Sequence, residues 1–321
     1  MKKTLLSIIA LVAGINSMWA IDNNTVEITY SGNSAKVTVA SNISSYVTVS
    51  SGTSSHVKIV QAASFTGNSI GEIEYILSGS SSDGEFYLEG GYKCTVTLAG
   101  VTLTNPKGPA VNIQNGKRID VSVKKETTNT LTDGVNEDYN GCFHSKGHTE
   151  CKGRGTLNVV GNSKHAIYSK EYMEVKNCTI NVTKAVKDGI HCKEYFLMES
   201  GVINISGVED DGIQVELSGT ASTGQKPLHE EEDTGNFYME DGTLTVAVYD
   251  YGGKHVKVDG SVVYGGGKRT FTTTPTSIED LQLNNGETTV TYDLSGRRTD
   301  RAQGIAIVRQ GGKTRKVLLK K

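Results

Sequence analysis

The chain has 321 residues, of which 36% are hydrophobic and 21% are charged, so it can form a core and wholesale disorder is excluded. Glycine is frequent, with 37 residues, but it does not recur at every third position, which excludes a collagen-like fibre. The formal net charge of −2 gives no indication of a general polyanion-binding protein. β-Branched and turn-forming residues dominate, which predicts an all-β protein with many tight turns.

The first residues have the layout of an export signal. Two lysines precede an apolar run at residues 5–12, and the segment ends near Ala20. The apolar run is too short for a comfortable transmembrane helix. We therefore expect residues 1–20 to be a signal peptide, and the mature chain to be secreted, extracellular or at the cell surface, without a transmembrane segment.

Alternating segments follow between residues 25 and 104, for example at residues 36–39 and 95–98. Alternation of apolar and polar side chains indicates strands with one buried face and one wet face. We interpret these segments as the N-terminal cap and the first coils of a repeat structure.

The middle of the chain contains an internal repeat. A coil opening with an apolar anchor recurs with a period of about 23 residues, which lies within the range of solenoid repeats. A second strand, with an asparagine in its centre, recurs with the same period. The anchors of the opening are Phe143, Ile167, Ile190 and Ile213, and those of the second strand are Leu157, Ile180 and Ile203. A unit of this length cannot bury its apolar face alone, so stacked units must share one core. The repeat predicts a right-handed parallel β-helix over residues 21–267. A leucine-rich repeat has a similar period, but its leucine pattern and helical half are missing.

The repeat register also predicts which side chains face outward. Three ladders result, each with one residue per coil: Lys146, Lys170 and Lys193; His148, Tyr172 and Tyr195; Asn158, Asn181 and Asn204. Lysines suit uronate carboxylates, and tyrosine rings offer an apolar face for a pyranose. The lysine ladder and the histidine–tyrosine ladder are therefore the predicted carbohydrate-binding surface. The alternative is that these residues only solvate the outer face of the strands and guard it against aggregation.

Five cysteines lie after the signal segment, and their number leaves at least one unpaired. The repeat places no two of them at equivalent points of neighbouring coils: Cys94, Cys142, Cys151, Cys178 and Cys192. We expect buried free thiols that act as small hydrophobic residues.

An acidic group recurs at the coil openings. Glu209, Asp210 and Asp211 form a triplet, and Asp188 occupies the corresponding position one coil earlier. Ca²⁺ takes six to eight oxygen ligands, which stacked turns supply readily, so these four residues are the predicted metal site. The alternative is that Asp-Gly simply makes a turn. An insertion at residues 216–235 contains a second acidic run at residues 230–233, whose role the sequence leaves open.

The composition changes near residue 268. Residues 268–277 form a polar linker in this interpretation, and residues 278–321 carry nine basic and five acidic side chains, a net charge of +4. Residues 21–275 have a net charge of −8, so an acidic body precedes a basic module. The tail motifs at residues 291–298, 304–308 and 316–320 resemble the C-terminal sorting domain of the type IX secretion system. This resemblance implies a small β-sandwich-like module that the secretion machinery of a Bacteroidetes-like bacterium would bind.

A second resemblance covers residues 22–265. The segments 102–118 and 129–134, with the coil openings at residues 164–167 and 188–191, resemble secreted bacterial carbohydrate-binding right-handed β-helix proteins. This family is shaped like pectate lyases, and the resemblance implies binding of calcium and of acidic or cellulosic plant polysaccharides. The opening Asp-Asp-Gly-Ile is kept at residues 210–213, whereas His165 and Lys187 depart from it. These departures weaken one of the implied cation sites.

The predicted function is non-catalytic, calcium-dependent binding of an acidic or plant-type polysaccharide. One alternative is a divergent polysaccharide lyase, for which Lys170, Lys193 or Arg154 would be the base, although no motif favours any of them. A hydrolase would need a carboxylate pair across a cleft, and no spacing indicates one. The other alternative is a structural adhesin or scaffold at the cell surface.

Overall fold

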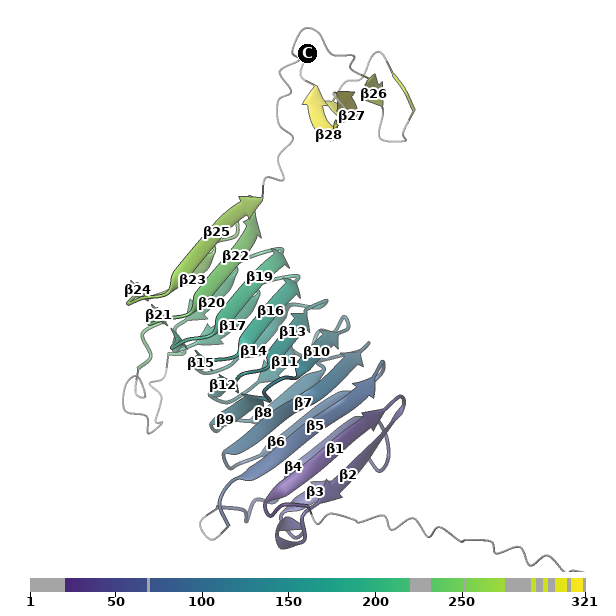
Figure 1. Cartoon of the computed structure of the whole chain (residues 1–321), viewed down its shortest axis with the longest axis vertical. Helices are drawn as coiled ribbons and strands as arrows, with labels where there is room; N and C mark the ends of the chain where they lie inside the picture. The colour runs from purple at the N-terminus through teal and green to yellow at the C-terminus, as the bar shows by residue number, and fades with distance from the viewer. Residues whose placement is uncertain are drawn as a thin grey trace, which may run out of the picture.

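The computed structural model describes residues 21–67, 70–219, 232–250, 252–274, 290–292, 297–299, 304–310 and 313–319. The predicted signal peptide lies outside the described residues, as do residues 220–231 of the predicted insertion. The structure is an all-β right-handed parallel β-helix, as the repeat predicts (Figure 1). No helix of the described residues is long and apolar enough to cross a membrane.

One wall of the β-helix is a nine-stranded sheet. Its strands are β3 (Val47–Val49), β4 (His56–Gln61), β6 (Glu85–Gly90), β8 (Val111–Asn115), β11 (Gly141–Ser145), β14 (His165–Ser169), β17 (Ile190–Lys193), β20 (Ile213–Glu216) and β23 (Val256–Val258). All neighbours in this sheet are parallel except β3, which pairs antiparallel with β4.

The other walls are two branches of a sixteen-stranded sheet that meet at β7 (Cys94–Asn105). The first branch contains β9 (Ile119–Val123), β12 (Thr149–Gly153), β15 (Met173–Lys176), β18 (Tyr195–Met198), β21 (Asn236–Met239) and β24 (Val262–Tyr264). The second branch contains β10 (Thr128–Asp133), β13 (Thr156–Val160), β16 (Thr179–Lys184), β19 (Val202–Val208), β22 (Thr243–Tyr249) and β25 (Lys268–Thr274). From β8 onward each coil therefore has three strands, one in each wall.

The repeat register is confirmed residue by residue. Phe143 pairs with Ile167, Ile167 with Ile190 and Ile190 with Ile213, and all four side chains are at most 1% exposed. These stacked apolar rows form one continuous core along the β-helix, because each strand pairs with its copy one coil away. The asparagine ladder is also confirmed: Asn181 and Asn204 each donate through Nδ2 to the preceding asparagine Oδ1 at 2.9 Å.

The five cysteines are free and buried, as predicted. Burial raises the pKa of the Cys178 thiol to about 11, so this thiol stays protonated at neutral pH. The cysteines therefore contribute small apolar volume to the coils rather than cross-links.

The N-terminal end of the core is covered, whereas the last coil is left exposed. At the N-terminal end β1 (Thr25–Ser31) pairs antiparallel with β2 (Ser34–Val39) and parallel with β5 (Ile73–Ser81), and the 3₁₀ turn η1 (Ser41–Ile43) inserts a buried isoleucine. At the other end Arg269 takes the register position of Leu244, and its guanidinium lies 4.1 Å from the ring centroid of Tyr264. A polar side chain thus replaces a core leucine where the stacking stops.

The predicted linker at residues 268–277 is wrong over its first part. Residues 268–274 form β25, which pairs parallel with β22 along seven residues. Alternation is weak there because the last coil has no further coil to cover it, so polar residues occupy inward positions. The predicted C-terminal module contains β26 (Val290–Tyr292), β27 (Gly304–Gln310) and β28 (Lys313–Leu319), which form an antiparallel sheet. The described residues show one sheet there, and the expected sandwich partner is not among them.

Candidate functional site

A row of rings runs along the outer face of the nine-stranded sheet. The strand register aligns His144 on β11, Tyr168 on β14 and His191 on β17. The rings of His144 and Tyr168 are stacked with centroids 5.2 Å apart, and those of Tyr168 and His191 with centroids 5.5 Å apart. Because each ring faces the next along the coil axis and none is more than 8% exposed, only ring edges remain for a ligand.

The lysine ladder lies beside this ring row. Lys146, Lys170 and Lys193 each follow a member of the ring row by two positions, so they share its face. Lys146 and Lys170 are exposed, and Lys193 is half-buried with its Nζ 3.7 Å from an oxygen of Glu216. The predicted lysine row is therefore present on three consecutive coils, and together with the three rings it forms a surface that we call the lysine face.

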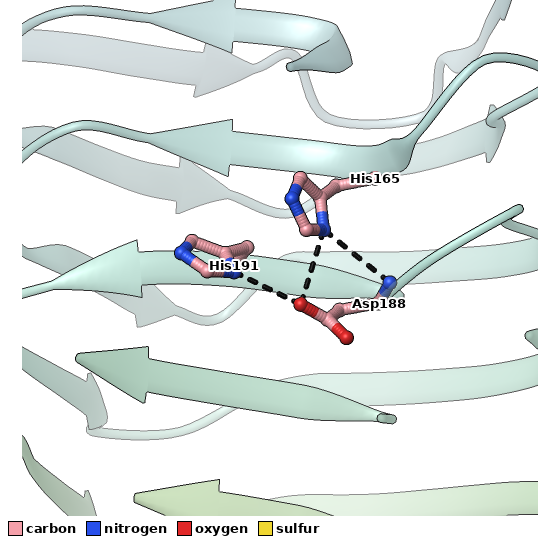
Figure 2. A group of neighbouring side chains, drawn as sticks. All are labelled: His165, Asp188 and His191. Atoms are coloured by element: carbon pink, nitrogen blue, oxygen red, sulfur yellow. Dashed lines mark hydrogen bonds and ion pairs between the residues drawn. The ribbon is translucent and has the colours of Figure 1, made fainter. Parts of the chain in front are cut away.

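A buried carboxylate lies at the edge of the lysine face. Asp188 precedes β17, is 1% exposed, and has its Oδ2 2.9 Å from Nδ1 of His191 and 3.1 Å from Nδ1 of His165 (Figure 2). Its Oδ1 accepts the backbone N–H of Asp211 at 3.1 Å, so Asp188 connects three successive coils. The backbone N of Asp188 also lies 3.3 Å from His165 Nδ1.

Burial and the two imidazoles set the charge of this group. Burial opposes ionisation of Asp188, but the hydrogen bonds from His165 and His191 outweigh it and hold the pKa of this carboxyl well below its usual range. Burial lowers the pKa of His165 against the attraction of Asp188, and it lowers the pKa of His144 to about 4, with a contribution from Lys146. The site thus holds a permanent carboxylate beside His165, an imidazole that resists a positive charge.

The predicted carbohydrate contacts of His148, Tyr172 and Tyr195 are wrong for the two tyrosines. Both face away from the coil core, but they are at most 2% exposed, because they form a separate cluster with Leu197 that Tyr238 covers. The rings stack on one another, with centroids 4.4 Å apart for His148–Tyr172 and 4.7 Å for Tyr172–Tyr195. The tyrosine hydroxyls donate to Glu150 and Glu174. No ring face is therefore left for a pyranose.

A carboxyl pair lies at the turn after the lysines. Glu171 and Glu194 are equivalent residues of neighbouring coils, and with His148 they bring one ligand atom each within 4.8 Å of one another. Burial, and then a hydrogen bond and repulsion from Glu194, raise the pKa of Glu171 to about 7. Glu171 therefore keeps its proton in the folded chain up to about neutral pH.

This pair predicts a pH-dependent stability. The folded-state pKa of Glu171 is raised from 4.5 to about 7, so its stabilisation is complete below the unfolded value and is lost as the pH rises through about 7. The two values correspond to at most about 3 kcal/mol, and partial exposure of the half-buried side chain reduces this to about 1 kcal/mol. We expect urea unfolding to show that, between pH 5 and pH 7.5, the unfolding free energy of wild type falls by about 1 kcal/mol relative to that of Glu171→Gln. Glu209→Gln, on an exposed turn, serves as a control, and parallel pH curves for wild type and Glu171→Gln would contradict the assignment.

The predicted metal ligands are brought together in part. Carboxylate oxygens of Asp188, Asp210 and Asp211 lie within 4.8 Å of one another, whereas Glu209 is not in this group. Asp211 Oδ1 accepts the backbone N–H of Lys254 at 2.8 Å, and its Oδ2 lies 2.8 Å from Lys257 Nζ. The oxygens of Asp188 and Asp211 thus already have N–H or ammonium partners, and Asp210 holds the exposed carboxylate of the group.

The candidate bases of a lyase do not converge. Lys170 and Lys193 are on the lysine face, whereas Arg154 lies in the turn after β12, where its backbone N–H donates to Val123. The carboxyl pair of Glu171 and Glu194 is hydrogen-bonded. A retaining glycosidase needs carboxyl groups about 5 Å apart, and an inverting one a wider separation. This pair therefore does not have the arrangement of a glycosidase.

The ring row and the two imidazoles on Asp188 were missed in the sequence. The signal was present, because His144, Tyr168 and His191 follow the same period as the apolar anchors. His165 and Asp188 are also one period apart, so equivalent positions of neighbouring coils hold an imidazole and a carboxylate.

Comparisons with known proteins concern the chain as a whole. The sequence model of a family described as carbohydrate-binding domain-containing protein matches residues 63–310. Among solved structures, the chain is similar to the polysaccharide lyase-like protein from C. thermocellum, determined as a gadolinium derivative. The two are 20% identical with a TM-score of 0.56, over 76% of this chain and 99% of that chain, so the similarity concerns the fold. No curated protein matches the chain.

Proposed function

Because the chain belongs to the family of carbohydrate-binding domain-containing proteins, we propose that it is a secreted, non-catalytic protein that binds an acidic polysaccharide on its lysine face. The observation that carries this proposal is the row Lys146, Lys170 and Lys193 on three consecutive coils, beside the edges of His144, Tyr168 and His191. Neighbouring parallel strands are about 4.8 Å apart, so a sugar chain laid along the axis would meet about one lysine per sugar.

The chemistry of the lysine face favours an acidic glycan over a neutral one. The stacked rings offer edges and no free faces, so stacking on a pyranose, which neutral cellulosic chains require, is not supported. Ammonium groups bind uronate carboxylates as point charges, and the Tyr168 hydroxyl can exchange hydrogen bonds with sugar hydroxyls. A polyuronate, which carries one carboxylate on each sugar, matches this arrangement.

Calcium is the second part of the proposal. Asp210 offers an exposed carboxylate beside Asp188 and Asp211, and turn carbonyls are the further oxygen ligands that calcium takes. Since the oxygens of Asp188 and Asp211 already accept N–H groups or an ammonium, calcium must share or displace these partners. We therefore expect calcium to strengthen polysaccharide binding without being essential for it.

The test is retention of the full chain on gelled polygalacturonate and on insoluble cellulose, each with calcium and with EGTA. We expect retention on polygalacturonate that high salt abolishes, stronger with calcium, and little retention on cellulose. Retention on neither polymer would overturn the carbohydrate assignment and leave the scaffold alternative. The similar structure is that of a polysaccharide lyase-like protein. The same samples are therefore measured for the ultraviolet absorbance of an unsaturated uronide. If this product forms, the protein is a lyase and not a non-catalytic binding protein.

Export belongs to the same proposal and is supported by sequence patterns alone. The apolar segment at residues 5–12, which two lysines precede, indicates a secreted or surface-attached protein. The basic tail after residue 278 indicates a C-terminal module that contacts the secretion machinery. Fractionation of the producing cells, with and without residues 278–321, tests this part. Unchanged export of the shortened chain would remove the sorting role and leave the glycan-binding proposal standing.

A further inference from the structure

We propose that His165, Asp188 and His191 form a binding site for a transition-metal ion of the Zn²⁺ type, distinct from the calcium expected at Asp210 although both groups include Asp188. The three donors lie on two neighbouring coils, His165 at the start of β14 and His191 within β17. Each offers one ligand atom, and these atoms lie within 4.8 Å of one another (Figure 2).

The distances within the group suit a tetrahedral ion. Asp188 Oδ2 is 2.9 Å from His191 Nδ1 and 3.1 Å from His165 Nδ1. Zn²⁺ binds imidazole nitrogen and carboxylate oxygen at about 2.0–2.2 Å, so two tetrahedral ligand atoms are about 3.3 Å apart. The ion would replace the protons now shared between these atoms, with small movements of the side chains.

The donor types select the metal. Two imidazoles and one carboxylate are the ligands of Zn²⁺, Co²⁺ or Ni²⁺, whereas calcium prefers oxygen ligands alone. Neutral imidazoles are required for ligation, and burial favours that state at His165. All three residues are at most 7% exposed, so water competes little for the ion.

A second carboxylate orients one of the ligands. Glu216 Oε2 lies 3.4 Å from Nε2 of His191, the ring nitrogen that does not face Asp188. A histidine that binds a metal through one nitrogen usually donates its other N–H to a carboxylate or carbonyl, which fixes the ring and raises its basicity. A structural hydrogen bond between Asp188 and His191 would not require this additional partner.

The surrounding charges also favour a cation. Asp210 and Asp211 lie with Asp188 in a second group of close carboxylates. Lys257 neutralises Asp211, and Lys193 is paired with Glu216, so these two ammonium groups are engaged with carboxylates. Asp210 therefore adds a carboxylate close to Asp188, which favours a divalent ion there.

The experiment is titration of the untagged, EDTA-treated full chain with Co²⁺, followed by the visible absorption of tetrahedral cobalt and by competition with Zn²⁺. We expect one tetrahedral Co²⁺ per chain and a Zn²⁺-dependent rise of the melting temperature. His191→Asn places an amide N–H where Nδ1 faces Asp188, so the fold should persist while affinity falls about 100-fold. Glu216→Gln should lower affinity about 10-fold or more.

His144→Gln is the matched control, because it removes an imidazole from the same ring row outside the metal site. It should leave cobalt affinity unchanged. Absence of the tetrahedral spectrum, or equal affinity in wild type and His191→Asn, would overturn the proposal. If cobalt instead binds to the separate group of His148, Glu171 and Glu194, the His191 variant will bind it as tightly as wild type does. Polygalacturonate retention measured with and without Zn²⁺ separates failure of this site from failure of the glycan proposal.

Discussion

Replacement of Lys146, Lys170 and Lys193 together by glutamine is expected to lower the affinity for polygalacturonate by about 30- to 100-fold. Exposed ion pairs contribute up to about 1 kcal/mol each, and removal of three such pairs together corresponds to about two decades of affinity. The effect depends on the row as a unit, since the lysines occupy consecutive coils and would bind consecutive sugars of one chain. Affinity electrophoresis in gels that contain polygalacturonate measures it.

A charge-matched control separates the lysine face from general electrostatics. Lys36, Lys124 and Lys125 are exposed and lie outside the nine-stranded sheet, in β2 and in the turn after β9. Their triple replacement by glutamine removes the same charge and should change affinity less than about 3-fold. The binding of wild type should weaken steeply with salt, because exposed charges are screened over about 10 Å at 0.1 M ionic strength. If both triple variants lose affinity equally, the lysine face is not the binding surface.

The periodic parts of this molecule could be predicted from its sequence because the β-helix repeats one physical requirement in each coil. An apolar side chain at the same point of every coil, as at Ile167, Ile190 and Ile213, can be buried only if strands stack in register. The asparagine ladder follows from the same rule. The lysine ladder was predictable too, since its members lie on the outward side of the register.

Other features depend on what covers a side chain, which the period does not disclose. Tyr172 and Tyr195 face outward as predicted, yet Leu197 and Tyr238 bury them, and the latter follows the insertion. Strand β25 was missed for a related reason, because Arg269 and Thr273 replace core residues at the last coil. The imidazole–carboxylate group combines residues from two positions of the repeat. His165 and Asp188 occupy one position in neighbouring coils, and His191 occupies the other. A comparison of one position along the coils therefore does not reveal the group.

Replacement of Asp188 by asparagine is expected to destabilise the metal-free protein by about 3 kcal/mol, because removing one partner of a buried charged network leaves the others unsatisfied. Asp188 accepts the backbone N–H of Asp211 and lies against Nδ1 of His165 and of His191, and an asparagine amide would direct its own N–H groups at some of these partners. For a domain of this size such a loss lowers the melting temperature by about 6–12 °C. Thermal unfolding in EDTA measures it.

Asp210→Asn provides the matched control on the same acidic turn. Asp210 is exposed, and burial together with repulsion from Asp211 and Asp188 raises the pKa of its carboxyl, so loss of its charge should leave stability unchanged within about 0.5 kcal/mol or raise it slightly. The contrast between the two neighbours follows from their partners rather than from their charge. Equal destabilisation by both substitutions would mean that the acidic turn acts as a unit. Only a selective loss at Asp188 agrees with a carboxylate that holds three coils and the two imidazoles in register.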